Sequence, residues 1–258
     1  MEIPIIDFAR IVEARPEIAR ELATISRTSG WVILTNHSIP DENVQQMMGT
    51  AQALLDMPGR ERWPRGDSLV GYDNSPTRGI DNAFLAGKPG DLAQQVLVLP
   101  PFWRPHLARI EAFKESCQEI LQKLLDCFAL AMELPDVPGQ HCGSHEQTVQ
   151  FRVRRYTSYI SEEPPFLMLP RSGSGSIGMV FYSANYTEVD MPSGDWAALP
   201  DPHGNVLVYL GDVIPFWSRG HLQKMQYRVV ESRSDQQGVE KINLAYISTT
   251  SPHEMLLH

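Results

Sequence analysis

The sequence predicts an α+β fold in which an α-rich N-terminal layer leads into an all-β core. Two observations predict it. Apolar residues repeat at helical spacing in three segments of residues 1–134, whereas short β-branched and aromatic runs separated by turn residues begin at residue 148. The second pattern favours an antiparallel β-sandwich or jelly roll. We expect a single domain over 1–258, with an α-rich region over 1–147 and the β core over 148–258.

The N-terminal elements follow from their patterns in chain order. A β-branched apolar run at 3–8 predicts a strand, and helical spacing over 16–27 predicts a helix that Gly30 ends. The run at 31–36 predicts a second strand. A second amphipathic helix is expected over 41–57, where acidic residues stand at its start.

The middle of the chain contains two segments with different sequence patterns. Residues 58–100 are rich in Gly, Pro, Asp and Asn, so we expect a long ordered loop with a short strand near 94–100. Loops of this length often contribute to binding sites. The longest helix is expected between 105 and 134, where apolar residues recur every three or four positions.

The C-terminal half contains the predicted β core. Each of its runs is short, rich in β-branched and aromatic residues, and bounded by turn residues. We expect strands within 148–160, 166–170, 176–182, 186–191, 196–200, 205–211, 223–232 and 241–249.

Composition limits the partners and the compartment. The 31 acidic and 22 basic side chains give a formal net charge of -9, which disfavours binding to nucleic acid or to anionic membranes. The three cysteines form no CxxC pair, and the N-terminus has no signal-peptide pattern. No apolar run is long enough to span a bilayer. We therefore expect a soluble, cytoplasmic protein.

A glycine run at 173–178 formally matches the pattern that binds a dinucleotide pyrophosphate. That site needs a helix beginning inside the glycine run, because the pyrophosphate sits at the N-terminus of the helix. The residues that follow are β-branched and aromatic and predict a strand instead. The run is therefore interpreted either as a flexible turn between two strands or as the remnant of another site.

Several motifs cover most of the chain and resemble those of one enzyme family. They are "IPIIDFA", "GWVILTNHSIP", "GDWAALPDPHGNVLVYLGD" and "WSRGHLQKMQYRVV". In this combination the sequence resembles the 2-oxoglutarate/Fe(II) dioxygenase superfamily, in its isopenicillin-N-synthase-like branch. The resemblance implies that the β core is a double-stranded β-helix, the jelly roll of that superfamily.

The resemblance also indicates where the family's iron ligands would stand. That family binds Fe(II) through two histidines and one carboxylate. The first His position is occupied by Arg171, the carboxylate position by Gly173 and the distal His position by Tyr227. Glycine cannot ligate a metal, arginine keeps its proton, and a lone tyrosine is a poor Fe(II) ligand. The expectation is therefore no metal and no cofactor.

The positions that bind 2-oxoglutarate in the family are also changed. The late-strand Arg-x-Ser is replaced by Lys241 and Asn243, and the early-strand Asn-x-Tyr by Arg154 and Tyr156. Lysine cannot reproduce the bidentate contact of arginine with a carboxylate. Of the remaining histidines, His37 matches a structural position of the family and is interpreted as a packing residue.

The replaced residues suggest a site hypothesis. If the strands alternate as in the family, one group of side chains points into the mouth of the barrel: Arg154, Tyr156, Arg171, Tyr227, Lys241 and Asn243. The leading hypothesis is a metal-independent, cofactor-free enzyme. It would catalyse an isomerisation, a cyclisation (including a pericyclic one) or an elimination of a small natural-product substrate. The catalytic candidates are Arg171 and Arg154 as oxyanion stabilisers, with Tyr227 or Tyr156 as general acid.

Other interpretations stay open. The arginines could pair with surface acids, Lys241 could be a solvated strand edge, and Tyr227 could fill the core. The chain could also be a non-catalytic scaffold or regulatory partner of an active oxygenase, a small-molecule binder, or a residual Fe(II)/2-oxoglutarate oxygenase. A homodimer is a further expectation for the assembly. Candidate substrate walls outside the barrel motifs are Tyr72, Phe84, Gln95, Phe216 and Trp217.

Overall fold

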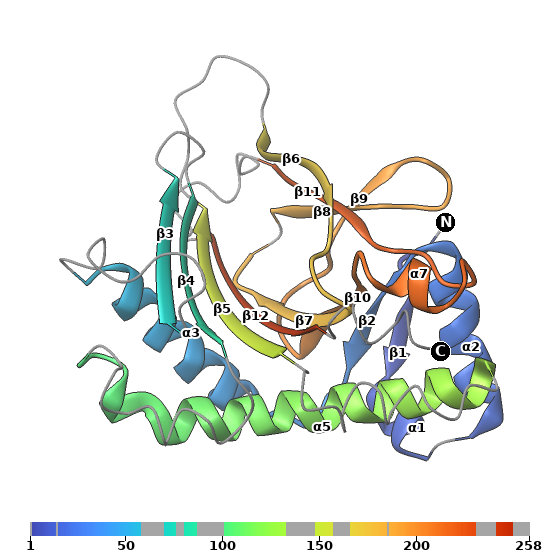
Figure 1. Cartoon of the computed structure of the whole chain (residues 1–258), viewed down its shortest axis with the longest axis horizontal. Coiled ribbons are helices and arrows are strands. Elements are labelled where there is room, and N and C mark those ends of the chain that lie inside the picture. The colour runs from blue at the N-terminus through green and yellow to red at the C-terminus, as the bar shows by residue number, and fades with distance from the viewer. Residues whose placement is uncertain are drawn as a thin grey trace.

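The computed structural model shows two β-sheets that face each other, with helices covering the outer face of the larger sheet (Figure 1). This is the fold class that the sequence predicts. The residues that the structure describes are 2–13, 15–57, 70–75, 80–86, 101–132, 148–156, 166–184, 186–230 and 241–249. Within these residues no helix has the length and apolar character needed to cross a membrane.

The described strands form one larger and one smaller sheet. The order in the larger sheet is β1 (Ile5–Asp7), β2 (Trp31–Thr35), β10 (Asn205–Leu210), β7 (Ile177–Tyr182), β12 (Lys241–Thr249), β5 (Thr148–Tyr156), β4 (Ile80–Ala86) and β3 (Val70–Ser75). The order in the smaller sheet is β6 (Phe166–Ser172), β11 (Gln226–Val230), β8 (Thr187–Asp190) and β9 (Trp196–Ala198). Each strand predicted after residue 148 is therefore confirmed, with shifted ends. The N-terminal region also contributes strands to the larger sheet.

The predicted helices are confirmed as well. The described helical segments are α1 (Phe8–Val12), α2 (Pro16–Thr28), α3 (Asp41–Leu55), the 3₁₀ turn η3 (Arg104–His106), α5 (Leu107–Met132) and α7 (Ile214–Trp217). Helix α5 runs along the side of the larger sheet that faces away from the smaller one (Figure 1). Its buried stripe, which includes Phe113 and Cys117, packs in the same core cluster as residues of β5 and β7.

The prediction of a long loop over 58–100 is wrong in part. Strands β3 and β4 form an antiparallel hairpin, and β4 pairs with β5 from Ile80↔Tyr156 to Ala86↔Gln150. These strands mix polar and apolar residues without a regular two-residue alternation, so the backbone pairing offered by β5 decides the structure where the local pattern does not. The strand expected near 94–100 lies outside the described residues.

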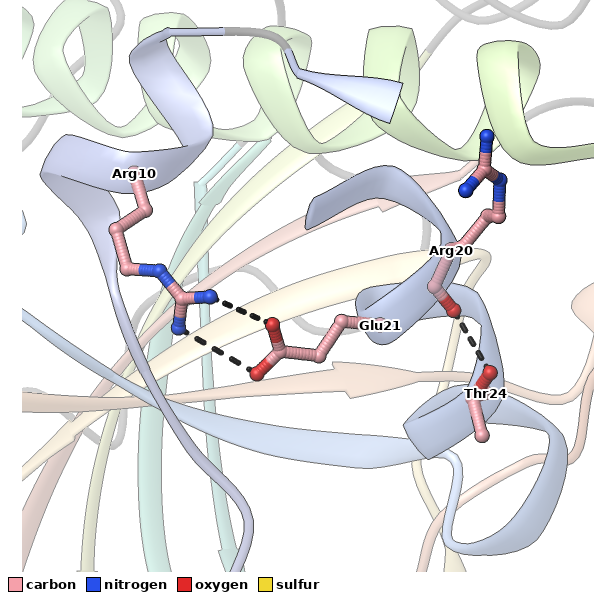
Figure 2. Close-up of polar contacts among 4 residues, drawn as sticks. All are labelled: Arg10, Arg20, Glu21 and Thr24. Carbon is pink, nitrogen blue, oxygen red and sulfur yellow. Dashed lines mark hydrogen bonds and ion pairs between the residues drawn. The ribbon is translucent and has the colours of Figure 1, made fainter. Parts of the chain in front are cut away.

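Figure 2 shows an ion pair between α1 and α2 and a hydrogen bond within α2. The guanidinium of Arg10 donates to both carboxylate oxygens of Glu21, at 2.7 and 3.4 Å. In α2 the Thr24 hydroxyl donates to the Arg20 carbonyl at 2.7 Å, one turn earlier. Because both members of the ion pair are exposed, we expect a contribution of only about 0–1 kcal/mol to stability.

The two faces of β5 have different partners. Val149, Phe151 and Val153 are buried in the core cluster shared with α5. The alternate residues, Arg152, Arg154 and Tyr156, face the space between the two sheets, where they line a pocket. The larger sheet therefore separates an apolar helix-facing core from a polar interior.

His37 follows β2 and is buried in the way the sequence predicts for a packing residue. Its ring is 3% exposed and meets Phe181 edge-on, with 5.6 Å between ring centroids. Burial lowers the pKa of His37, and the negative charge of Asp41 offsets this only in part. The folded protein therefore favours the neutral imidazole.

The lowered pKa of His37 predicts a pH dependence of stability. Above the ordinary histidine pKa of about 6.5 the ring is neutral in both the folded and the unfolded state, so it does not lower the free energy of unfolding. As pH falls through that value the unfolded chain gains a proton that the folded state resists, and the free energy of unfolding should decrease. Urea unfolding at pH 7 and pH 5 should show a smaller decrease for His37→Phe than for the wild type. Equal decreases would contradict this assignment.

Candidate functional site

A pocket lies between the two sheets. Strands β5, β7, β10 and β12 of the larger sheet form one wall, and β8 and β11 of the smaller sheet form the other. Its polar side chains include Arg152, Arg154, Tyr156, Tyr209 and Tyr227. Its apolar side is formed by Val180, Leu199, Leu207, Met225 and Ile247. A cavity with an apolar wall and a few converging polar groups is typical of a small-molecule site.

Two arginines on β5 dominate the polar end. Arg154 Nη1 donates to the Tyr156 hydroxyl at 3.2 Å, and its guanidinium lies 5.9 Å from the centre of the Tyr156 ring. Tyr227 on the opposite sheet lies close enough to Arg154 to influence its charge. Arg152 donates to the side-chain oxygen of Gln150 on the same strand. Among the described residues that line the pocket there is no aspartate or glutamate.

The tyrosines do not neutralise these cations. Burial raises the pKa of Tyr156 and of Tyr209, so both phenols stay protonated at neutral pH. Burial lowers the pKa of Arg154 and the oxygens of Tyr156 and Tyr227 raise it, so the guanidinium stays protonated. The pKa of Arg152 is lowered, first by burial and then by the charge of Arg154. The pocket therefore contains two adjacent positive charges among neutral hydrogen-bonding groups.

Three buried polar atoms around the pocket lack hydrogen-bond partners within the described part of the chain. They are Nε of Arg152, Nε of Arg154 and the hydroxyl oxygen of Thr187. Buried polar groups in native proteins are nearly always hydrogen-bonded, and an unpaired one costs free energy. These atoms are free to bind a molecule in the pocket.

Tyr209 on β10 packs against the glycine run at 173–178, which formally matches a nucleotide-binding pattern. A Cβ atom added to Gly173 would lie 2.4 Å from the Tyr209 ring, and one added to Gly178 would meet the same ring at the same distance. The Tyr209 hydroxyl donates to the Ser174 carbonyl at 3.1 Å. Strand β7 follows the run where a nucleotide site would need a helix. The glycines therefore make room for an aromatic ring.

The structure brings together some of the predicted site residues. Arg154, Tyr156, Tyr227 and Asn243 line the pocket, and the Asn243 side-chain oxygen accepts a hydrogen bond from Tyr186. Lys241 is buried but is not part of the lining.

Arg171 is placed differently from the expectation that it points into the barrel. It pairs in register with Tyr227, but its side chain is exposed and does not line the pocket. Arg171 stands near the end of β6, where a long cationic side chain can keep its head group in water.

The predicted substrate walls are not described at the level of side chains. Tyr72 lies in β3 and Phe84 in β4, while Phe216 and Trp217 lie in α7. Only their backbone positions are described. Gln95 lies outside the described residues.

The residues present do not match the iron site of the family that the sequence resembles. Of the three ligand positions, Arg171 is exposed, Gly173 has no side chain and faces the Tyr209 ring, and Tyr227 is a phenol that lines the pocket. No group of three or more His, Cys, Asp or Glu side chains suited to a metal ion occurs among the residues described. That donor set does not fit Fe(II) bound in the family's manner.

Sequence reasoning missed three residues of this site: Arg152, Thr187 and Tyr209. Arg152 could have been found, because it stands two positions before Arg154 on a predicted strand and so shares its face. Thr187 and Tyr209 gave no comparable signal. Their roles depend on how β8 and β10 face the arginines and the glycine run.

Comparison with known proteins relates the whole chain to dioxygenases. Residues 3–96 match the sequence profile of the family described as "non-haem dioxygenase in morphine synthesis N-terminal". A fission yeast (Schizosaccharomyces pombe) protein named UPF0676 protein C1494.01 is 25% identical over 99% of this chain and 84% of its own length. Gibberellin 2-beta-dioxygenase 5 of rice is 22% identical over 99% of this chain and 75% of its own length.

A solved structure agrees on the fold. The structure of the rice dioxygenase for auxin oxidation superposes with a TM-score of 0.76, at 22% identity, over 98% of this chain and 84% of that one. This likeness confirms the double-stranded β-helix that the sequence resemblance implies.

The comparisons overturn the leading functional hypothesis. Metal-independent, non-oxidative isomerisation, cyclisation or elimination finds no support among the relatives, since those with a named activity are dioxygenases. The hypothesis treated the loss of ligand residues as evidence for new chemistry, and replacement of ligands alone does not specify a reaction.

The family match at the N-terminus, the whole-chain relatives and the barrel geometry agree. The chain is therefore similar over its whole length to dioxygenases, one of them named as 2-oxoglutarate-dependent, and it shares their fold.

Proposed function

We propose that this protein binds a small organic molecule in the pocket between its sheets and does so without the iron site of the superfamily that it resembles. The observation that supports this most strongly is the pair of arginines with unpaired Nε atoms, Arg152 and Arg154, in a pocket whose described lining residues include no acid. Unpaired buried cations are strongly destabilising unless a partner compensates them. A ligand is the partner that a pocket of this kind can accept.

The replacement of the iron ligands is part of the same proposal. Gly173 stands at the carboxylate position, and the Tyr209 ring occupies the space that its side chain would need. Tyr227 stands at the distal His position, lines the pocket and influences the charge of Arg154. Two of the three ligand positions thus serve the packing and polarity of the pocket.

A second candidate is an Fe(II)/2-oxoglutarate-dependent oxygenase, which the names of the relatives favour. Gibberellin 2-beta-dioxygenase 5 and validamycin A dioxygenase are both related over 99% of this chain. An oxygenase would require iron ligands other than those the family uses, since Arg171, Gly173 and Tyr227 stand at those positions.

An iron-loading experiment separates the two candidates. Protein incubated anaerobically with Fe(II) and then desalted should retain far less than one iron per chain by elemental analysis. It should also show no oxygen-dependent consumption of 2-oxoglutarate, while a known superfamily oxygenase handled in parallel shows both. Stoichiometric iron together with turnover of 2-oxoglutarate would establish the second candidate and refute the proposal.

A pocket-filling substitution tests where small molecules bind. Ala245 on β12 lines the pocket, so Ala245→Leu should fill part of it and abolish the thermal stabilisation that any pocket ligand gives the wild type. Ala112→Leu makes the same change on an exposed position of α5 and should leave that stabilisation intact. Ligands that stabilise the Ala245→Leu variant as well as the wild type would place binding elsewhere.

The packing of Tyr209 against Gly173 predicts a stability effect. Gly173→Ala should lower the free energy of unfolding by about 1–3 kcal/mol, because its Cβ would collide with the ring. The loss should shrink when Tyr209→Ala is combined with it, since the two positions are in contact. Gly49→Ala, in α3 with nothing near the added atom, should instead stabilise by about 0.5–1 kcal/mol. Chemical denaturation of the four variants measures this, and a neutral Gly173→Ala would argue against the packing.

A further inference from the structure

We infer that the ligand of this pocket is a small organic acid whose carboxylate lies between Arg152 and Arg154 on β5 and whose short carbon body faces the apolar wall. This inference rests on the proposed function and adds the chemical class of the ligand. Four features of the pocket lead to it: the charge of β5, the unpaired donors, the position of the site in the barrel and the apolar wall.

The charge of β5 requires an anion. Arg152 and Arg154 are two residues apart on one strand, so both guanidinium groups extend from the same face of the sheet. Arg155, next to Arg154, faces the other way and has its own partner, with Nη1 2.5 Å from the Asp56 carboxylate. The described hydrogen-bond partners of the pocket arginines are Gln150 and the Tyr156 hydroxyl, both of them neutral. An anion would relieve both the desolvation of the cations and their mutual repulsion.

The unpaired donors come from both sheets. The Nε atoms of Arg152 and Arg154 belong to the larger sheet, and the hydroxyl of Thr187 belongs to the smaller one. The Tyr227 hydroxyl adds a further polar group from the smaller sheet. A carboxylate has two oxygens that can accept several hydrogen bonds at once, and arginine binds it with two parallel N–H groups. The donors therefore match the acceptor geometry of a carboxylate.

The position of this site differs from the one the family uses for its co-substrate. There, an arginine on the late strand grips the distal carboxylate, and the corresponding residue here, Lys241, does not line the pocket. The cations of this chain are on β5 instead, and one of them, Arg154, stands where the family has asparagine. The cations that could hold an anion in this pocket therefore lie on β5, whereas the family uses an arginine on the strand that corresponds to β12.

The apolar wall distinguishes an organic acid from an inorganic anion. Leu199, Leu207 and Met225 line the pocket together with the arginines. An inorganic phosphate would satisfy the cations but would leave these side chains in contact with water. A carboxylate that has a short hydrocarbon body would bury them, at about 25 cal/mol per Å² of apolar surface.

Calorimetric titration of the full chain with defined probes tests the inference. The probes are sodium acetate, butyrate, succinate and benzoate, the neutral butyramide and benzamide, and inorganic phosphate, all at equal ionic strength. We expect at least one carboxylate to bind about tenfold or more tightly than its amide and than phosphate, because the amide carries no charge and phosphate has no apolar body. Arg152→Met and Arg154→Met should each weaken that binding about tenfold or more. Arg155→Met, which removes a charge from the opposite face of β5, should leave it unchanged.

Two further variants keep the test decisive if the methionine variants fold poorly. Arg154→Lys retains the charge without the planar fork and should bind the carboxylate more weakly than the wild type but more tightly than Arg154→Met. Thr187→Val removes only the hydroxyl from the opposite wall and should also weaken binding.

The remaining outcomes separate the inference from the proposed function. Amides that bind as well as acids, with binding lost in Ala245→Leu, would overturn the carboxylate assignment and leave the pocket as a small-molecule site. Phosphate that binds most tightly would likewise overturn the organic acid. If neither this panel nor a broad set of neutral compounds binds the wild type, the proposed function fails together with the inference.

Discussion

Side-chain alternation along β5 is the constraint on which the site depends. The strand must bury Val149, Phe151 and Val153 against the helical layer and at the same time present Arg152 and Arg154 to the interior of the barrel. A shift of one residue would exchange the two sets and bury two cations in the apolar core. Pairing on both sides prevents such a shift, because β5 is held in register by β12 and by β4. The polar pocket and the apolar core are thus consequences of a single register.

Tyr209 packs against Gly173, the glycine at the position where the family resemblance places a carboxylate ligand. Gly173 and Gly178 flank the strand turn so that the ring can lie against the backbone at both positions. A carboxylate at 173 and a tyrosine at 209 could not both occupy this space without rearrangement, since even a Cβ atom would collide with the ring. The loss of one side chain and the presence of the other are therefore one packing feature. This also explains why the run contains glycine although no phosphate-binding helix follows it.

Most of the fold could be predicted from the sequence, because the strands after residue 148 and helices such as α5 carry clear periodicity. The hairpin of β3 and β4 could not, since its mixed polar and apolar residues follow no such period and its pairing depends on β5. In the site, Arg154, Tyr156 and Tyr227 were predicted as pocket residues from strand alternation and from the family resemblance. Arg171 pairs in register with Tyr227, but its side chain is exposed at the end of β6, and strand alternation alone does not predict this. Tyr209 was missed because its role arises only when β10 packs against the glycine run.

The charge of the pocket is opposite to that of the whole protein. A formal net charge of -9 produces a field that repels anions at long range, so an anionic ligand gains nothing from electrostatic steering as it approaches. Its affinity must then come from contacts inside the pocket, at distances where the guanidinium groups are close and water is largely excluded. Salt screens the long-range field within about 10 Å at 0.1 M ionic strength, whereas buried pairs are screened much less. Raising the ionic strength therefore weakens the repulsion on approach more than it weakens the contacts with Arg152 and Arg154. A surface cluster of cations would show the opposite salt dependence, so the sign of the salt effect on affinity reports whether the anion is bound inside the barrel.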